Sequence, residues 1–133
     1  MNFISGIAIF VGAGFGALLR WALGHWLNAL LPTLPPGTLA ANVLGGLLMG
    51  LALGAFVQYE ALPPALRLAF TTGFLGGLTT FSTYSAESAT LLLRGEFRWA
   101  CLHTLAHVVL SLLATLAGLA GIRGLFKMLG GAA

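Results

Sequence analysis

A polar stretch interrupts a long apolar region of the sequence. Residues 73–87 read GFLGGLTTFSTYSAE. Serine and threonine side chains crowd its second half, at Thr79, Thr80, Ser82, Thr83 and Ser85, with Ser88 just beyond it. Hydroxyl groups can donate hydrogen bonds to an anion. Clustered glycines followed by threonines favour a helix break, and freed carbonyls at membrane depth are tolerated only inside protein or beside a cavity. We therefore expect a broken membrane helix that carries an ion path.

An aromatic pair and an acid belong to the same stretch. Phe81 and Tyr84 are three residues apart and share one face of a helix. Such pairs usually pack together, but aromatic ring edges carry partial positive charge and can also face an anion. Glu87 follows them, and a carboxylate inside a membrane is a candidate functional group. Glu87 can equally lie at the helix end, in water.

Two further polar residues lie on glycine-rich faces. Arg20 follows Gly16 by four residues, so it either snorkels to the membrane interface or supplies positive potential at a vestibule. Asn42 precedes Gly46 by four residues. Its amide either joins two helices by hydrogen bonds or offers N–H donors to an anion in a cavity.

A second polar stripe occurs near the C-terminus. His103, His107, Ser111 and Thr115 follow one another at steps of four residues, which places them on one helix face. The two histidines have the spacing of two zinc ligands. Zinc proteolysis is nevertheless excluded, because no Glu follows the first histidine. A polar pore wall or hydrogen bonding between helices explains the stripe better.

The composition shows what kind of protein positions these residues. Of the 133 residues, 59% are hydrophobic and only 7% are charged, whereas a soluble domain has about 25% charged residues. The mean hydropathy is +0.99. These values indicate an all-α integral membrane protein formed by one domain, residues 1–133. The 19 glycines indicate closely packed helices.

Four apolar segments are each near the ~20 residues that cross a bilayer. We expect membrane helices at about 3–24, 38–57, 62–91 and 99–121. The third is too long for one straight span, which agrees with a break in its middle. The N-terminus has no Lys or Arg before its apolar run, so we interpret it as the start of the first span rather than a signal peptide.

The charges are few and evenly distributed. The net charge is +3 without a basic cluster, so a nucleic-acid partner is not expected. The predicted ends of the spans carry three cations on each side, which are Arg20, Arg94 and Arg98 against Arg67, Arg123 and Lys127. The positive-inside rule then selects no orientation. Either the protein has one orientation that this count misses, or it inserts both ways and pairs antiparallel. The single Cys101 excludes a disulfide framework.

The run GGLTTFSTYSAE resembles the signature of the Fluc, or CrcB, family of fluoride channels. The similarity extends to GTLAANVLGG in the second segment and to the Gly16–Arg20 spacing in the first. It implies an antiparallel, dual-topology homodimer with two pores in the inner (plasma) membrane. It also implies a structural sodium ion at the dimer centre, held by the backbone carbonyls of Gly76 and Thr79.

The resemblance implies roles for side chains as well. The expected fluoride path comprises Asn42, Phe81, Ser82, Thr83, Tyr84, His107 and Ser111, with Arg20 and Glu87 at the vestibule. Two positions depart from the family. Tyr84 stands where Phe is usual, which bears on the permeation rate more than on the function. His107 stands where Tyr is frequent.

We therefore expect a channel, not an enzyme, that lets cytoplasmic fluoride leave the cell passively and so lowers its toxicity. Fluoride is small and strongly hydrated, so its dehydration must be offset by donors. One rival is a small multidrug-type cation/proton exchanger, which needs an acid inside its first helix; the acids here are Glu60, Glu87 and Glu96. Another rival is a structural subunit of a membrane complex, which would explain the glycines but not the polar path.

Overall fold

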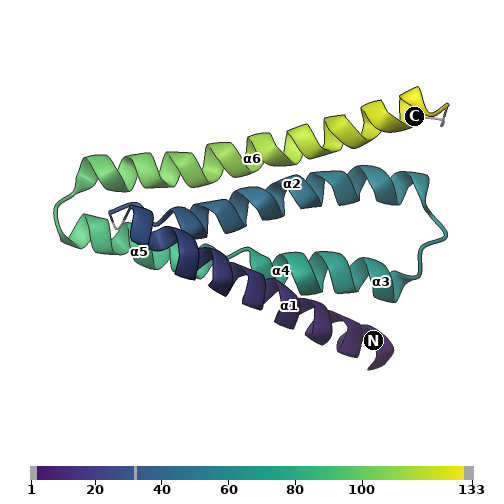
Figure 1. Cartoon of the computed structure of the whole chain (residues 1–133), viewed down its shortest axis with the longest axis horizontal. Helices are drawn as coiled ribbons and strands as arrows, with labels where there is room; N and C mark the ends of the chain where they lie inside the picture. Colours follow the sequence, from purple (N-terminus) through teal and green to yellow (C-terminus); the bar gives the residue numbers. More distant parts are fainter. Residues whose placement is uncertain (1–2, 32, 131–133) are drawn as a thin grey trace.

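The computed structural model describes residues 3–31 and 33–130, and these are helical apart from short connections. The elements are α1 (Phe3–Leu27), η1 (Asn28–Leu30), α2 (Pro36–Gln58), α3 (Pro64–Leu68), η2 (Ala69–Leu75), α4 (Gly76–Leu78), α5 (Phe81–Leu93) and α6 (Phe97–Met128). In Figure 1, α6, α2 and the row formed by α3 to α5 run alongside one another, and α1 crosses the row.

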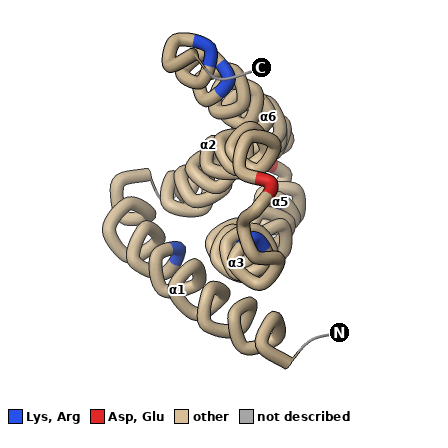
Figure 2. The backbone as a smooth tube through the Cα atoms, turned by 90° about the vertical axis from the view of Figure 1, so that its right-hand side faces the viewer, with Lys and Arg blue, Asp and Glu red and all other residues tan. Residues whose placement is uncertain are grey.

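Three segments are long and apolar enough to cross a membrane. They are α1 with η1 (Phe3–Leu30), α2 and α6. Charged residues are sparse along the whole tube in Figure 2. Large apolar side chains such as Phe10, Phe15 and Leu93 point outward and are exposed. In water this surface would be unfavourable, whereas lipid tails solvate it, so the chain is an all-α membrane protein.

Glycines let α2 and α6 approach backbone to backbone. A Cβ atom added at Gly50 would overlap the carbonyl oxygen of Thr115, and one at Gly46 would lie 2.6 Å from the carbonyl oxygen of Ser111. Gly46 and Gly50 thus form a glycine stripe that packs α2 against α6, and the closely packed helices that the glycines indicated are confirmed here. Because Asn42 is one turn before this stripe, it faces the same seam.

Two of the glycines of residues 73–77, Gly73 and Gly77, pack closely against α1. We predicted that the clustered glycines and the threonines after them break the helix, but Gly73 lies in the π-helix η2 and Gly77 lies in α4. A Cβ atom at Gly77 would overlap the carbonyl of Ala13, and Gly12 is equally close to Ala69. These glycines therefore bring α1 against η2 and α4, since small residues permit close helix contact.

The break itself lies one step later, at two threonines. Thr79 has φ −80° and ψ 154°, and Thr80 has φ −150° and ψ 117°. Both are extended, and α5 resumes at Phe81. The predicted broken third segment is thus confirmed, with its interruption at Thr79–Thr80. The helix that we expected at 99–121 continues to Met128, so Arg123 and Lys127 are helical rather than part of a tail.

Candidate ion path

A central cavity of about 450 Å³ lies between α2, the broken row and α6. It is lined by most residues that the sequence singled out: Asn42, Gly76, Thr79, Phe81, Tyr84, His107 and Ser111. These come from three separate segments of the chain. The structure therefore brings the helix break, the aromatic pair and the second polar stripe together at one place.

A second cavity of about 280 Å³, the end cavity, lies toward the end of the bundle where α2 begins. Arg20, Thr38, Thr80 and Thr83 are among its lining residues. Thr80 lines the central cavity as well. This residue of the break therefore lies between the two cavities, and Thr83 and Arg20 are on the side of the end cavity only.

Asn42 stabilises the break by pairing with the backbone of Thr80. Its Oδ1 accepts a hydrogen bond from the Thr80 N–H at 2.8 Å, and its Nδ2 donates to the Thr80 carbonyl at 3.1 Å. Nδ2 also lies 3.1 Å from His107 Nδ1. Since both polar groups of an extended residue need partners away from water, Asn42 replaces the helical hydrogen bonds that the break removes.

The hydroxyl of Thr80 caps the helix that follows. Its Oγ1 accepts from the Thr83 N–H at 3.1 Å, as N-cap residues of α-helices commonly do. The same oxygen lies 3.0 Å from Thr83 Oγ1 and 3.2 Å from Ser82 Oγ. Ser82 was expected in the path, yet it contacts this hydroxyl cluster without lining either cavity.

Arg20 points inward to the broken row. Its Nε donates to the Gly77 carbonyl at 3.0 Å, at the carbonyl end of α4. The Arg20 side chain therefore does not simply extend to the membrane interface, which was one of the two alternatives. The break juxtaposes two helix ends of opposite character, because the C-terminal end of α4 exposes carbonyls and the N-terminal end of α5 exposes N–H groups. The Gly76 and Thr79 carbonyls belong to the former, and cations favour such half-helix ends.

The aromatic pair continues into the two histidines. The ring of Tyr84 lies 5.3 Å from Phe81, 4.9 Å from His107 and 5.5 Å from His103, between centroids. The Tyr84 hydroxyl donates to Thr104 Oγ1 at 3.3 Å. Tyr84 and His107, the two residues that we expected to depart from the family pattern, are therefore in contact with each other.

Two buried polar atoms in this region have no hydrogen-bond partner among the described residues. They are Ser111 Oγ and His107 Nε2. A buried polar group without a partner costs about 1–3 kcal/mol. Because both residues line the central cavity, the cost would be relieved by a ligand or water held there.

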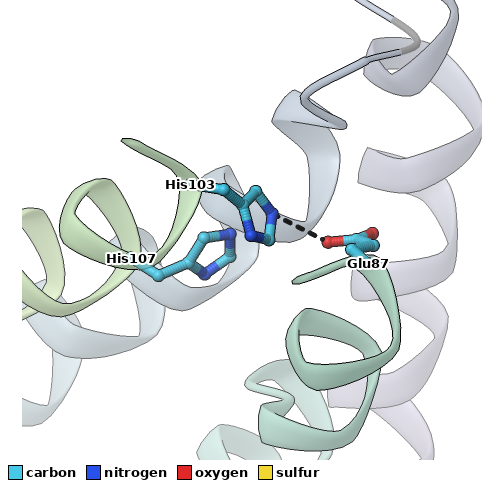
Figure 3. Close-up of side chains that lie close together, drawn as sticks. All are labelled: Glu87, His103 and His107. Carbon is cyan, nitrogen blue, oxygen red and sulfur yellow. Dashed lines mark hydrogen bonds and ion pairs between the residues drawn. The ribbon is translucent and has the colours of Figure 1, made fainter. Parts of the chain in front are cut away.

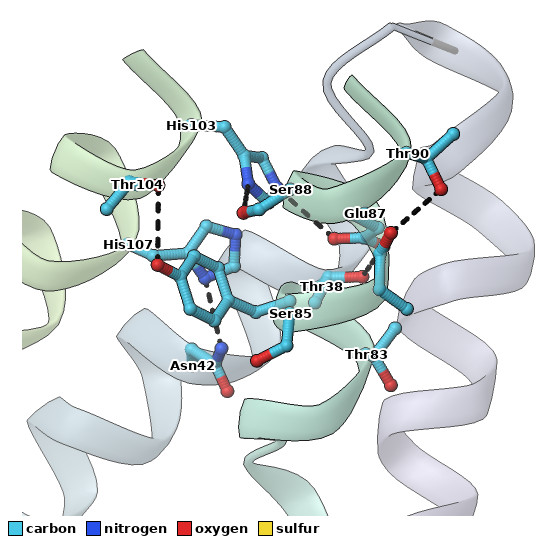
Figure 4. Close-up of polar contacts among 12 residues, drawn as sticks. Thr38, Asn42, Thr83, Ser85, Glu87, Ser88, Thr90, His103, Thr104 and His107 are labelled. Atoms are coloured by element: carbon cyan, nitrogen blue, oxygen red, sulfur yellow. Dashed lines mark hydrogen bonds and ion pairs between the residues drawn. The ribbon is translucent and has the colours of Figure 1, made fainter. Parts of the chain in front are cut away.

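Glu87 is partly buried within a small polar cluster. Its carboxylate accepts from Thr38 Oγ1 at 2.6 Å and lies within hydrogen-bond distance of His103 Nε2, at 3.2 Å. His103 Nδ1 lies 3.0 Å from Ser88 Oγ. Figure 4 shows these side chains between α2, α5 and α6. Of the two alternatives for Glu87, a position in bulk water is thus ruled out.

Comparison with known proteins gives a family. The family model described as "CrcB-like protein, Camphor Resistance (CrcB)" matches residues 7–119. The chain belongs to the CrcB-like family. A relative from Burkholderia mallei (strain SAVP1), named "Fluoride-specific ion channel FluC", is 57% identical over 88% of this chain and 90% of its own length. The same name and identity apply to a Burkholderia pseudomallei (strain K96243) relative with the same coverage, and one from Cupriavidus pinatubonensis is 55% identical over 85% and 90%.

The sequence reasoning missed some residues of the site in this CrcB-like protein. Thr80 was noted only among the hydroxyls, although it joins the two cavities. Thr38 carried no signal, because a threonine in the first turn of a helix is common. His103 was assigned to a polar stripe with His107 and Ser111; its ring does contact His107, and it also reaches Glu87 of α5 (Figure 3). Only contacts between helices distinguish these roles.

Proposed function

We propose that this CrcB-like protein is a fluoride-specific ion channel that lets cytoplasmic fluoride leave the cell passively. The relatives' names support this function, and so does one observation in particular. The hydroxyl of Ser111 is buried, lines the central cavity and has no partner within the described structure. Such a hydroxyl is a donor kept available for an anion, beside the aromatic edges of Phe81 and Tyr84.

The proposed path runs from the end cavity through Thr80 to the central cavity. Fluoride is strongly hydrated, so each step must replace water with other donors. Arg20 provides positive potential at the end cavity, and the hydroxyls of Thr83 and Thr80 follow it. None of the described residues that line the central cavity is Lys or Arg. A fixed cation there would hold the anion too tightly for conduction. The α5 N-terminus adds favourable partial charge.

The proposed assembly is an antiparallel homodimer of a four-span domain comprising residues 1–133. The broken row of α3 to α5 would be the fourth span. Phe81 lines the central cavity and is 80% exposed, as expected of a pore wall that a second copy completes. The Gly76 and Thr79 carbonyls of both copies would hold the sodium ion. The ion would neutralise facing carbonyl ends and so link the two broken rows.

Fluoride efflux from liposomes tests the channel proposal. We expect proteoliposomes loaded with potassium fluoride to release fluoride when valinomycin is added, as followed by a fluoride electrode, and to retain chloride. Phe81→Ile should slow the release because it removes the ring edge, without preventing assembly. Phe15→Ile, at an exposed position of α1, is the matched control. No fluoride release by the wild type would refute the channel, and undiminished release by Phe81→Ile would refute the path.

Replacing sodium tests the proposed central ion. We expect dimers in detergent to dissociate more readily when sodium is replaced by N-methylglucamine, because facing carbonyl groups would then repel one another. The dimer fraction measured by size-exclusion chromatography with light scattering reports this. An unchanged dimer fraction after exhaustive exchange would count against sodium.

The rival functions are less well supported. A multidrug-type exchanger requires an acid in its first helix, and α1 contains none. Glu87 is close to the path but is paired with His103. A structural subunit would have no use for an unpartnered hydroxyl beside a cavity. Fluoride flux that is accompanied by stoichiometric proton movement would favour the exchanger, and the absence of any flux would favour the subunit. In either case the protein is not an enzyme.

A further inference from the structure

The cluster of Glu87, His103 and His107 combines metal-ligating groups from two helices. One potential ligand atom from each of these residues lies within 4.8 Å of the others. His103 and His107 are one turn apart on α6, and Glu87 comes from α5 (Figure 3). Both histidines are buried, with 3% and 5% of their surface exposed. The spacing on α6 alone suggested two ligands; α5 supplies the third.

We propose that Glu87, His103 and His107 form a binding site for a divalent transition-metal ion, for which Zn²⁺ is the best match. Two imidazoles and one carboxylate, with a fourth position left to water, are a common ligand set for zinc. Hard ions such as Mg²⁺ prefer oxygen ligands, and thiolate-dependent ions lack a Cys here. The site shares His107 with the central cavity but binds a different ion, and in this it goes beyond the proposed function.

The geometry is close to what zinc requires. With Zn–ligand bonds of about 2.0–2.1 Å in a tetrahedron, ligand atoms are about 3.3 Å apart. His103 Nε2 and Glu87 Oε2 are 3.2 Å apart. The remaining separations, up to 4.8 Å, would close by small side-chain rotations. The metal would take the place of the hydrogen bond that now joins His103 to Glu87.

An independent observation also indicates a missing ligand. His107 Nε2 is buried and has no partner among the described residues. Its other nitrogen, Nδ1, is within 3.1 Å of the Asn42 amide, which fixes the orientation of the ring. Figure 3 shows a nitrogen of His107 directed toward His103. A second partner that orients each liganding imidazole is typical of metal sites, and Ser88 provides it for His103 at 3.0 Å.

The cluster lies near one end of the bundle. His103 follows the first residue of α6, Phe97, by only six positions, which is about 9 Å along the axis. Thr38 lines the end cavity and hydrogen-bonds Glu87. A metal ion could therefore enter from the end cavity and displace the Thr38 hydroxyl from the carboxylate.

Metal titration of the full-length protein tests this proposal. Tag-free protein carrying Cys101→Ser, which removes the exposed thiol, is titrated with Zn²⁺ by calorimetry. Co²⁺ then serves as a spectroscopic probe of the geometry. We expect one Zn²⁺ per chain with micromolar affinity and the intense visible absorption of tetrahedral Co²⁺. His103→Gln and His107→Gln should each weaken binding by about tenfold or more. His25→Gln, which changes the remaining histidine on α1, should bind like the parent.

X-ray absorption of the zinc-loaded parent protein needs no variant and so does not depend on the variants folding. A first shell containing two imidazoles supports the site. The proposal would be overturned by a first shell of water oxygens, by no binding in the micromolar range, or by a zinc affinity of both His103→Gln and His107→Gln that equals that of the parent protein. Zinc binding without fluoride efflux would uphold this site and refute the channel, whereas efflux without zinc binding would refute the site alone.

Discussion

Asn42 and Thr80 show how one side chain makes a helix break possible inside a membrane. The break leaves the Thr80 N–H and carbonyl outside the helical ladder, and Asn42 pairs with both, at 2.8 and 3.1 Å. The sequence suggested that Asn42 either joins helices or donates to an anion. The contacts show that its amide pairs with protein groups, so its main role is to hold the backbone of Thr80 in place beside the path.

Asn42→Ala should therefore destabilise the protein as well as slow fluoride flux. It leaves two buried backbone groups unpaired, each costing about 1–3 kcal/mol. We expect a lower midpoint of thermal unfolding in detergent, measured by tryptophan fluorescence, together with reduced efflux. Asn28→Ala is the matched control, since it removes a single hydrogen bond to Gly37 in a connection near the bundle end. Equal midpoints for Asn42→Ala and the wild type would contradict this account.

Tyr84→Phe should have a small effect. The hydroxyl makes one long hydrogen bond, 3.3 Å to Thr104, and a typical bond contributes only about 0.5–1.5 kcal/mol. The ring that contacts Phe81 and His107 remains. We expect the free energy of unfolding to fall by no more than that contribution. We expect fluoride efflux, measured with the electrode, at or above the wild-type rate. Tyr59→Phe, remote from both cavities, is the control. A loss of flux comparable to that of Phe81→Ile would show that the hydroxyl itself contacts the ion.

At the scale of elements, glycine determines which helices can meet. The α2–α6 seam uses Gly46 and Gly50, and the contact of α1 with the broken row uses Gly12 and Gly77. At each contact the glycine has no side chain, so the two backbones pack closely. Such van der Waals packing is a main attraction between helices in lipid. The α1 contact packs one side of the broken row, and on another side Gly45 of α2 approaches the side chain of Thr79 at the break.

Gly50→Ala should loosen the α2–α6 seam. The added methyl group would overlap the carbonyl of Thr115, and overpacking of this kind costs about 1–3 kcal/mol. Gly121→Ala on α6 is the control, because nothing lies within 4 Å of the atom that it adds. We expect only Gly50→Ala to unfold at a lower temperature. A similar decrease for both variants would indicate that glycine flexibility, rather than packing, matters.

At the scale of the whole molecule, the charge distribution bears on how the chain inserts. Arg94 and Arg98 lie at the end where α5 meets α6, and Arg123 and Lys127 lie at the opposite end of α6. Figure 2 shows how few charges there are to set an orientation. Arg20 donates a hydrogen bond to the Gly77 carbonyl within the bundle, so its charge contributes little to the charge difference between the two sides of the membrane.

Dual topology predicts that the C-terminus appears on both sides of the membrane. Fusing either a cytoplasmic fluorescent reporter or a periplasmic phosphatase to the C-terminus should give comparable activity for both fusions. Adding two lysines beside Arg94 should shift the ratio strongly toward the orientation that keeps this end inside. Activity from one reporter only would contradict the antiparallel dimer.

Much of the fold could be predicted because it depends on local composition. Apolar length sets the spans, and the 3.6-residue period places glycines and polar residues on faces. The positions of Phe81 and Tyr84, one turn apart, follow from that period. The expected break included the glycines because their local flexibility is visible in sequence, whereas the close contacts of Gly73 and Gly77 with α1 are not. Its last residue, Thr79, is where the structure places the interruption.

The sequence by itself determined the class of protein, three of the four expected spans, the polar stretch and, through its motif, the family. Only the tertiary structure decided what those polar groups contact. Asn42 binds Thr80 thirty-eight positions away, and Glu87 meets His103 across two helices. Whether a buried polar atom is paired or left available depends on its neighbours in space. That the Ser111 hydroxyl and the His107 Nε2 atom have no partner in the described part of the chain is therefore visible only once the helices are packed.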